Sequence, residues 1–170
     1  MDLYEVSVPQ FSKMLHNLDR WLDAGITYAK AKKFEPDQLL AQRLSPDMYP
    51  LTKQVQAACD AAKYACAYLA GKQAPSHPDT EKTIDELRAR IRTAISYLET
   101  FKREEFNGAA DRKVAPPWLG GKWLTAPDYL FQAAFPNFYF HVTTAYDILR
   151  HSGVDTLGKQ TFIGHLPVRD

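Results

Sequence analysis

The residues of this chain that are best suited to chemistry lie near its C-terminus, where Asn137 and His141 are four positions apart. In a helix this spacing places both side chains on one face, one turn apart. Histidine can act as an acid, a base or a metal ligand near neutral pH. Pro136 directly precedes the pair, and a proline inside a helix costs about 3 kcal/mol or forces a kink. A local violation of helical rules beside two polar residues indicates a functional or strained site.

An earlier helical segment supplies the polar groups that could face this pair. If the carboxylate of Asp60 reaches His141, it can orient the imidazole as a general base, so His141 and Asp60 are our candidate catalytic residues. In a second interpretation, polar side chains from the two segments bond one another and ordered water, and they either fix the register of the helices or line a polar pocket for an unidentified small molecule. The predicted pocket residues are Gln54, Gln56, Asn137 and His141.

A metal site at the same place is a third reading. His141 would bind zinc or nickel, with Asn137, Gln54 and Asp60 as the available partners. Catalytic zinc sites usually have three nitrogen, sulfur or carboxylate ligands from the protein, and side-chain amides are weak ligands for these ions. We therefore expect no tightly bound cofactor. No glycine-rich phosphate loop and no motif for a serine or cysteine nucleophile accompanies these residues.

Apolar residues that recur at helical spacing predict the elements that must position this site. The first helix should begin at Ser7 as N-cap, and the second should begin at Pro50 and end at Gly71. Thr125 is the expected N-cap of the fourth helix. The predicted helices span approximately residues 7–32, 50–71, 80–101 and 125–153.

The fourth segment has a predicted inner face that includes both polar residues. At 100° per residue, an ideal wheel places these side chains in the core: Leu130, Ala133, Ala134, Asn137, His141, Thr144, Ala145 and Ile148. Three aromatic residues face away from that stripe, namely Phe138, Tyr139 and Tyr146. They should either cover another element or form a contact between subunits.

Four helices of this length predict an all-α fold, an antiparallel four-helix bundle. We expect short connections, apart from a small hairpin or ordered loop between the third and fourth helices, where Gly120 and Gly121 interrupt residues 107–127. The length favours a single domain that spans residues 1–170.

Charge and composition exclude several classes of partner. The chain has 21 Lys and Arg against 20 Asp and Glu, so we expect no nucleic-acid partner. Because no apolar run approaches the ~18 residues of a membrane span, we expect no membrane partner either. Cys59 and Cys66 lie roughly 10 Å apart along a helix, too far for a disulfide. These features predict a soluble, cytoplasmic protein.

Three stretches of the chain resemble a known bacterial family. They are SPDMYPLTKQVQAACDAAK at 45–63, PNFYFHVTTAYDILRHSGV at 136–154 and LGKQTFIG at 157–164. In this order and at these separations they resemble a domain-of-unknown-function family of the DinB-like helical-bundle superfamily. The resemblance implies a four-helix bundle with one longer connection and a homodimer as partner state.

The superfamily also implies a metal held by three histidines, one on the second helix and two on the fourth. His141 matches the last of the three, whereas Asn137 stands at the position of its partner. A glutamine, Gln54 or Gln56, stands where the second-helix histidine is expected. Three functions follow as hypotheses: a bundle protein with a degenerate metal site whose pocket binds a small molecule, a metal- and thiol-dependent transferase or hydrolase-like enzyme, and a non-catalytic structural or stress-associated dimer.

Overall fold

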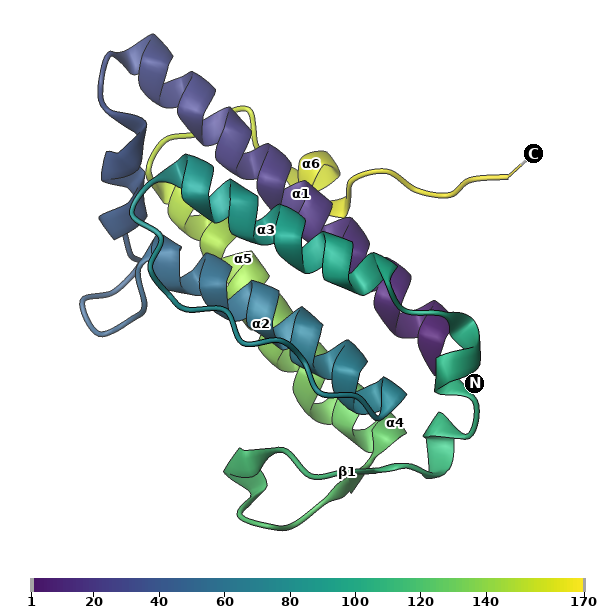
Figure 1. Cartoon of the computed structure of the whole chain (residues 1–170). Coiled ribbons are helices and arrows are strands. Elements are labelled where there is room, and N and C mark those ends of the chain that lie inside the picture. Colours follow the sequence, from purple (N-terminus) through teal and green to yellow (C-terminus); the bar gives the residue numbers. More distant parts are fainter. Residues whose placement is uncertain (1, 170) are drawn as a thin grey trace.

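The structure is a computed structural model that describes residues 2–169. Four long helices lie side by side (Figure 1). They are α1 (Leu3–Lys32), α2 (Leu51–Ala70), α3 (Ile84–Glu99) and α5 (Phe135–His151). Apolar side chains from all four form one continuous core. The predicted all-α four-helix bundle is therefore confirmed.

The first helix begins four residues earlier than predicted. Asp2 is its N-cap, and the Asp2 carboxylate accepts a hydrogen bond from the backbone N–H of Tyr4 at 3.0 Å. Ser7, the predicted cap, is buried inside the helix and donates its hydroxyl to the carbonyl of Leu3. An N-terminal aspartate satisfies the free backbone donors as well as serine does, so the helix extends to it.

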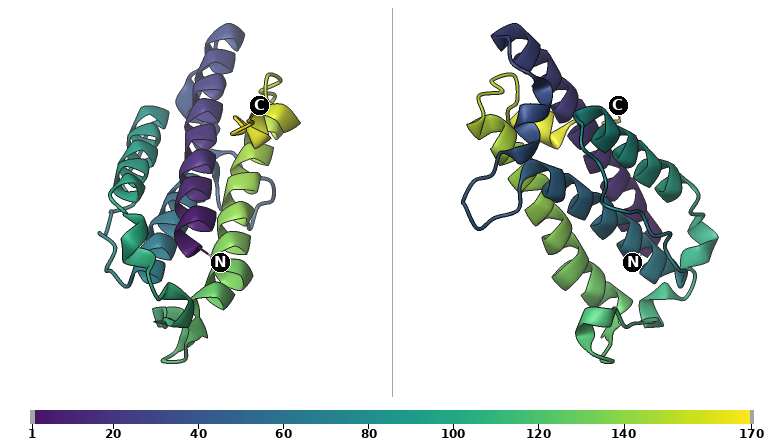
Figure 2. Two further views of the ribbon diagram at one scale, coloured as in Figure 1. Left: turned by 90° about the vertical axis from the view of Figure 1, so that its right-hand side faces the viewer. Right: turned by 60° about the vertical axis from the view of Figure 1, so that its left-hand side comes forward.

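Helices α2 and α3 run in the same direction, antiparallel to α1 and α5. Residues 72–83, which we predicted to be a short connection, instead return along the bundle as an extended crossover (Figures 1 and 2). The N–H of Ile84 donates to the carboxylate of Asp37 at 2.9 Å, and the N–H of Leu51 donates to the carbonyl of Gln42. Both helices therefore begin beside the short helix η1 (Pro36–Ala41).

The helix predicted over residues 125–153 is interrupted by a π-helical turn. It begins as α4 (Ala126–Tyr129), capped by the Thr125 hydroxyl as predicted, and continues through the π turn η5 (Leu130–Ala134) into α5. At the end of this turn the N–H of Phe135 donates to the carbonyl of Leu130, five residues earlier. Pro136 follows in the first turn of α5. The wider turn thus lies where the missing proline donor would have left an α-helix strained.

The π turn corrects the predicted inner face. Because the π turn contains one extra residue, every later side chain is shifted by one position around the helix. Phe138, for example, takes the direction that an ideal wheel gives to Asn137. Phe138 and Val142 are therefore fully buried, Asn137 is exposed and His141 is half-buried. The prediction that Asn137 and His141 point into the core, with Phe138 facing away, is wrong.

The three aromatic residues in question cover α1. The ring centroids of Phe138 and Phe11 are 4.8 Å apart. Gln10 donates to the hydroxyl of Tyr139. The ring of Tyr146 packs at 5.3 Å against that of Trp21. Of the two roles predicted for these residues, the covering of another element is the one observed.

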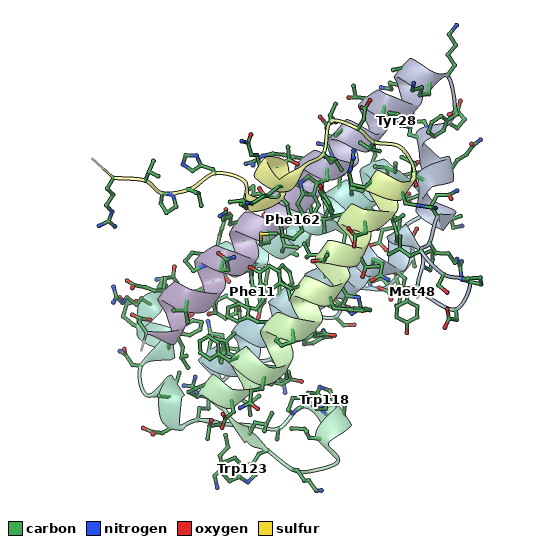
Figure 3. All side chains as sticks on the ribbon, turned by 180° about the vertical axis from the view of Figure 1, so that it is seen from behind. Phe11, Tyr28, Met48, Trp118, Trp123 and Phe162 are labelled. Carbon is green, nitrogen blue, oxygen red and sulfur yellow. The ribbon has the colours of Figure 1, made fainter. Side chains whose placement is uncertain are left out.

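A two-stranded hairpin precedes α4, as predicted. Strand β1 (Lys113–Val114) pairs antiparallel with β2 (Leu124–Thr125), and the short helix η4 (Pro117–Leu119) and the glycine pair lie between them. Gly120 and Gly121 both have positive φ angles, 58° and 87°. Figure 3 shows Trp118 and Trp123 on this hairpin at one end of the bundle.

The remaining short helices are η2 (Arg103–Phe106), η3 (Ala109–Asp111) and α6 (Lys159–Ile163). Helix α6 was not expected from the sequence. It lies against α1, where Phe162 stacks on Trp21 with ring centroids 5.2 Å apart (Figure 3). Within residues 2–169, no helix is long and apolar enough to cross a membrane.

Candidate functional site: a groove beside His141

A groove of about 890 Å³ lies between α2 and the helical run of residues 126–151. Its volume falls within the range of small-molecule sites, roughly 300–1,000 Å³. Alanines line its middle, where larger side chains would fill the space. The residues around it are Tyr49, Lys53, Ala57, Asp60, Ala61, Tyr64, Tyr68, Pro117, Trp118, Tyr129, Ala133, Ala134, Asn137 and His141.

His141 is held in the wall of the groove by a buried glutamine. Its Nδ1 lies 2.7 Å from Oε1 of Gln54, which is 1% exposed. Nε2 of Gln54 also donates to the backbone carbonyl of Tyr49 at 3.2 Å. The amide is thereby fixed at both ends, and it in turn fixes the imidazole ring. Of the two glutamines predicted to face His141, Gln54 is the one that does so.

The surroundings of His141 favour its neutral form. Burial lowers the pKa of the imidazole, and the ammonium of Lys53 lowers it further. Neutral imidazole can accept a hydrogen bond or a proton, which the imidazolium cannot do. At neutral pH, His141 therefore offers the groove an imidazole in its basic form.

Asp60 lines the groove but does not act on His141. Its Oδ1 lies 2.8 Å from Nζ of Lys63 and 3.2 Å from Nη2 of Arg90. Two cations from the other side of α2 thus engage the carboxylate. The predicted His141–Asp60 general base is wrong, because α2 directs this carboxylate toward α3 rather than toward the imidazole.

Gln56, predicted to line the pocket, lies on the opposite side of α2. It is buried, and its Nε2 donates to Oε2 of Glu81 in the crossover at 2.8 Å. Two positions along a helix correspond to a rotation of about 200°, so Gln54 and Gln56 cannot face the same groove. The prediction that Gln56 is a pocket residue is therefore wrong.

Asp60 and Gln56 belong to a network of charges, here called the crossover network. Arg90 lies at the centre of this network and is 5% exposed. It also forms ion pairs with Glu81 and Asp79, each at 3.0 Å. Burial alone would raise the pKa of Glu81, but hydrogen bonds from Gln56 and Arg90 outweigh it, and the pKa is lowered. The full network comprises Lys53, Gln56, Asp60, Lys63, His77, Asp79, Glu81 and Arg90.

The side chains at His141 do not suit a tightly bound zinc or nickel ion. Among the described residues, no group of three His, Cys, Asp or Glu side chains comes together as a metal site would require. Asn137 offers an amide, Lys53 adds a positive charge, and Asp60 is held by two cations. Since such ions favour three strong protein ligands, we assign no chemical step to a metal.

The aromatic half of the groove was not predicted from the sequence. Tyr64 and Tyr68 are one turn apart on α2, and the ring of Tyr68 meets that of Tyr129 edge to face at 5.7 Å. These tyrosines were not among the residues predicted from the sequence. The spacing of four residues between Tyr64 and Tyr68 is a signal that could have marked them as neighbours, whereas only the fold brings in Tyr129. Trp118, 65% exposed, reaches the groove from the hairpin.

Comparison with known proteins identifies a family model and a solved structure to which this chain is similar. A family model described as a domain of unknown function (DUF1993) matches residues 3–163. A crystal structure of a DinB family member protein from Shewanella denitrificans, at 1.83 Å resolution, superposes with a TM-score of 0.94. It is 45% identical in sequence, and the match covers 99% of this chain and 95% of that chain. Among curated proteins there is no match.

Proposed function

We propose, for a chain that belongs to the DUF1993 family and is DinB-like in fold, that the groove beside His141 binds a small organic molecule. The observation that carries the proposal is the combination of an open groove of about 890 Å³ with a neutral imidazole anchored in its wall. Binding sites for small molecules typically combine such apolar lining with a few fixed polar groups.

The alanines along the groove support this proposal. Ala57 and Ala61 on α2 face Ala133 and Ala134 across the gap. A bundle under selection for stability alone would fill such a gap with larger side chains, because unfilled space forfeits packing energy. Small residues that keep a groove open beside a polar anchor are what a ligand requires.

Substitutions that fill the groove with larger side chains test whether it binds a small molecule. The probe is 1-anilinonaphthalene-8-sulfonate, whose fluorescence rises in apolar sites, titrated into the wild-type protein. We expect saturable binding at one site. The double substitution Ala61→Leu/Ala133→Leu, which places two larger side chains opposite each other, should abolish it.

The matched control is Ala24→Leu, a partly buried alanine on α1 outside the groove. This variant should bind the probe as the wild type does. Circular dichroism of all three proteins verifies that the bundle remains folded. Equal binding by the double variant and the control would show that the probe does not occupy the groove and would contradict the proposal.

A further inference from the structure

The amide of Gln54 can take only one orientation. The carbonyl oxygen of Tyr49 accepts hydrogen bonds and cannot donate them, so the NH₂ group of Gln54 must face it, 3.2 Å away. The side-chain oxygen of Gln54 is then the atom that faces Nδ1 of His141, at 2.7 Å. An oxygen of this kind can only accept, and Nδ1 must therefore carry the proton.

This orientation determines what His141 offers to the groove. In a neutral imidazole with its proton on Nδ1, Nε2 has a free lone pair and acts as an acceptor. His141 lines the groove, whereas Gln54, buried behind it, does not. The Nδ1 edge of the ring thus faces α2, and Nε2 is the nitrogen left for a bound molecule.

The groove is polar at one end and aromatic at the other. Because the two helices are antiparallel, Gln54 meets His141 at one end and Tyr68 meets Tyr129 at the other. These ends are about 20 Å apart, at 1.5 Å per helical residue. The alanines lie between them, and Trp118 and Pro117 complete the aromatic end.

We infer that the groove takes an elongated aromatic alcohol, whose hydroxyl donates to Nε2 of His141 and whose rings extend over the alanines toward the tyrosines. The inference rests on the proposed function, and it adds an orientation and a ligand class to it. Gln54 is then a positioning residue, since it fixes the proton of His141 without touching the ligand. A molecule of the same shape without the donor leaves the Nε2 lone pair unmatched.

Two probes of nearly the same shape test the inference: 4-phenylphenol, and 4-fluorobiphenyl, in which a fluorine replaces the hydroxyl and cannot donate a hydrogen bond. Calorimetric titration of the wild-type protein should show the phenol binding about tenfold more tightly, the factor expected from one hydrogen bond of about 1.4 kcal/mol. Equal affinities for the two probes would overturn the inference and leave the proposed function intact. If neither probe binds, the inference fails, and the titration with 1-anilinonaphthalene-8-sulfonate decides the proposed function separately.

Gln54→Met tests the positioning role. Without an acceptor at Nδ1, the imidazole is free to place its proton on Nε2, and the preference for the phenol should fall to within about threefold. The matched control is Gln56→Met, the same change at a buried glutamine on the other side of α2, which should keep the tenfold preference. An unchanged preference in Gln54→Met would overturn the role of Gln54. If that variant does not fold, the wild-type comparison of the two probes still decides the inference.

Discussion

Helix α2 contacts two regions whose polar side chains are arranged differently. Toward α3 and the crossover, Gln56 and Lys63 enter a network in which acids and bases are paired. Toward α5, Gln54 and His141 form a single pair beside a row of alanines. The first region is a buried set of ion pairs, in which Nε of Arg90 alone has no partner among the described residues, whereas the second lies beside an open groove.

The two regions contribute differently to the stability of the bundle. Residues 72–83 form neither a helix nor a strand. Ion pairs between this crossover and Arg90 hold it against the bundle. Breaking a buried ion pair is costly, so the crossover network fixes the connection between the two helices. The groove contributes less to stability, and we therefore expect substitutions in the two regions to separate stability from binding.

The largest effect should follow from Arg90→Met. This change removes the cation that faces Asp60, Asp79 and Glu81 and leaves three carboxylates without it. We expect a loss of about 3–5 kcal/mol in the free energy of unfolding, measured by urea denaturation.

The control is Arg92→Met, two positions further on the same helix, where the side chain is more than half exposed and meets Asp19 at 3.5 Å. It should cost no more than about 1 kcal/mol, as exposed ion pairs do. Similar losses in the two variants would mean that the crossover network contributes no more to the free energy of unfolding than an exposed ion pair does.

Acid should weaken the same region. The pKa values of Asp79 and Glu81 are lowered in the folded state, where hydrogen bonds and nearby cations outweigh the effect of burial. A carboxyl group whose pKa is lower in the folded state stabilises the fold at pH values above its pKa in the unfolded chain, which is about 4. This stability is lost as the pH falls through the pKa of the folded state. Urea midpoints should therefore drop below pH 4.5, and more steeply in the wild type than in Arg90→Met. Parallel pH profiles would contradict this assignment.

His141→Ala should have a smaller effect on stability. The oxygen of Gln54 loses its partner, but the site is half-open to water, so we expect about 1 kcal/mol. Binding of the fluorescent probe should weaken at the same time. A loss as large as that of Arg90→Met, with binding unchanged, would indicate that the pair serves only to hold α5 on α2.

The smallest change in stability should come from Trp118→Ala, because this side chain is 65% exposed on the hairpin. We expect a change within about 0.5 kcal/mol. Since Trp118 lines the aromatic end of the groove, affinity for the fluorescent probe 1-anilinonaphthalene-8-sulfonate should nevertheless fall. Trp123→Ala on the same hairpin, which does not line the groove, provides the comparison. Equal affinities in the two variants would remove Trp118 from the site.

The sequence predicted the bundle well because its helix boundaries carry local signals. Pro50 and Gly71 bracket α2, and Thr125 caps α4. The direction of α3 was not predictable in this way. It depends on contacts between Arg90 and residues of the crossover, which are distant in the sequence and become neighbours only in the fold.

The sequence predicted one contact of the candidate site but not the orientation of its side chains. Gln54 was among the partners expected for His141, and the two side chains meet in the structure. An ideal wheel cannot anticipate the π turn, whose extra residue brings Phe138 into the core and leaves Asn137 exposed. The rule of helical periodicity therefore misplaced the side chains of the fourth helix by one position.

The protonation of the His141 ring tests the central claim most directly, because the proposed ligand needs an acceptor nitrogen at the open groove. Nitrogen-15 NMR of the histidine side chains, with Gln54→Met to assign the affected ring, distinguishes the two tautomers at pH 7.5. We expect His141 to show a protonated Nδ1 and an unprotonated Nε2. A ring protonated at Nε2, or at both nitrogens, would contradict the account.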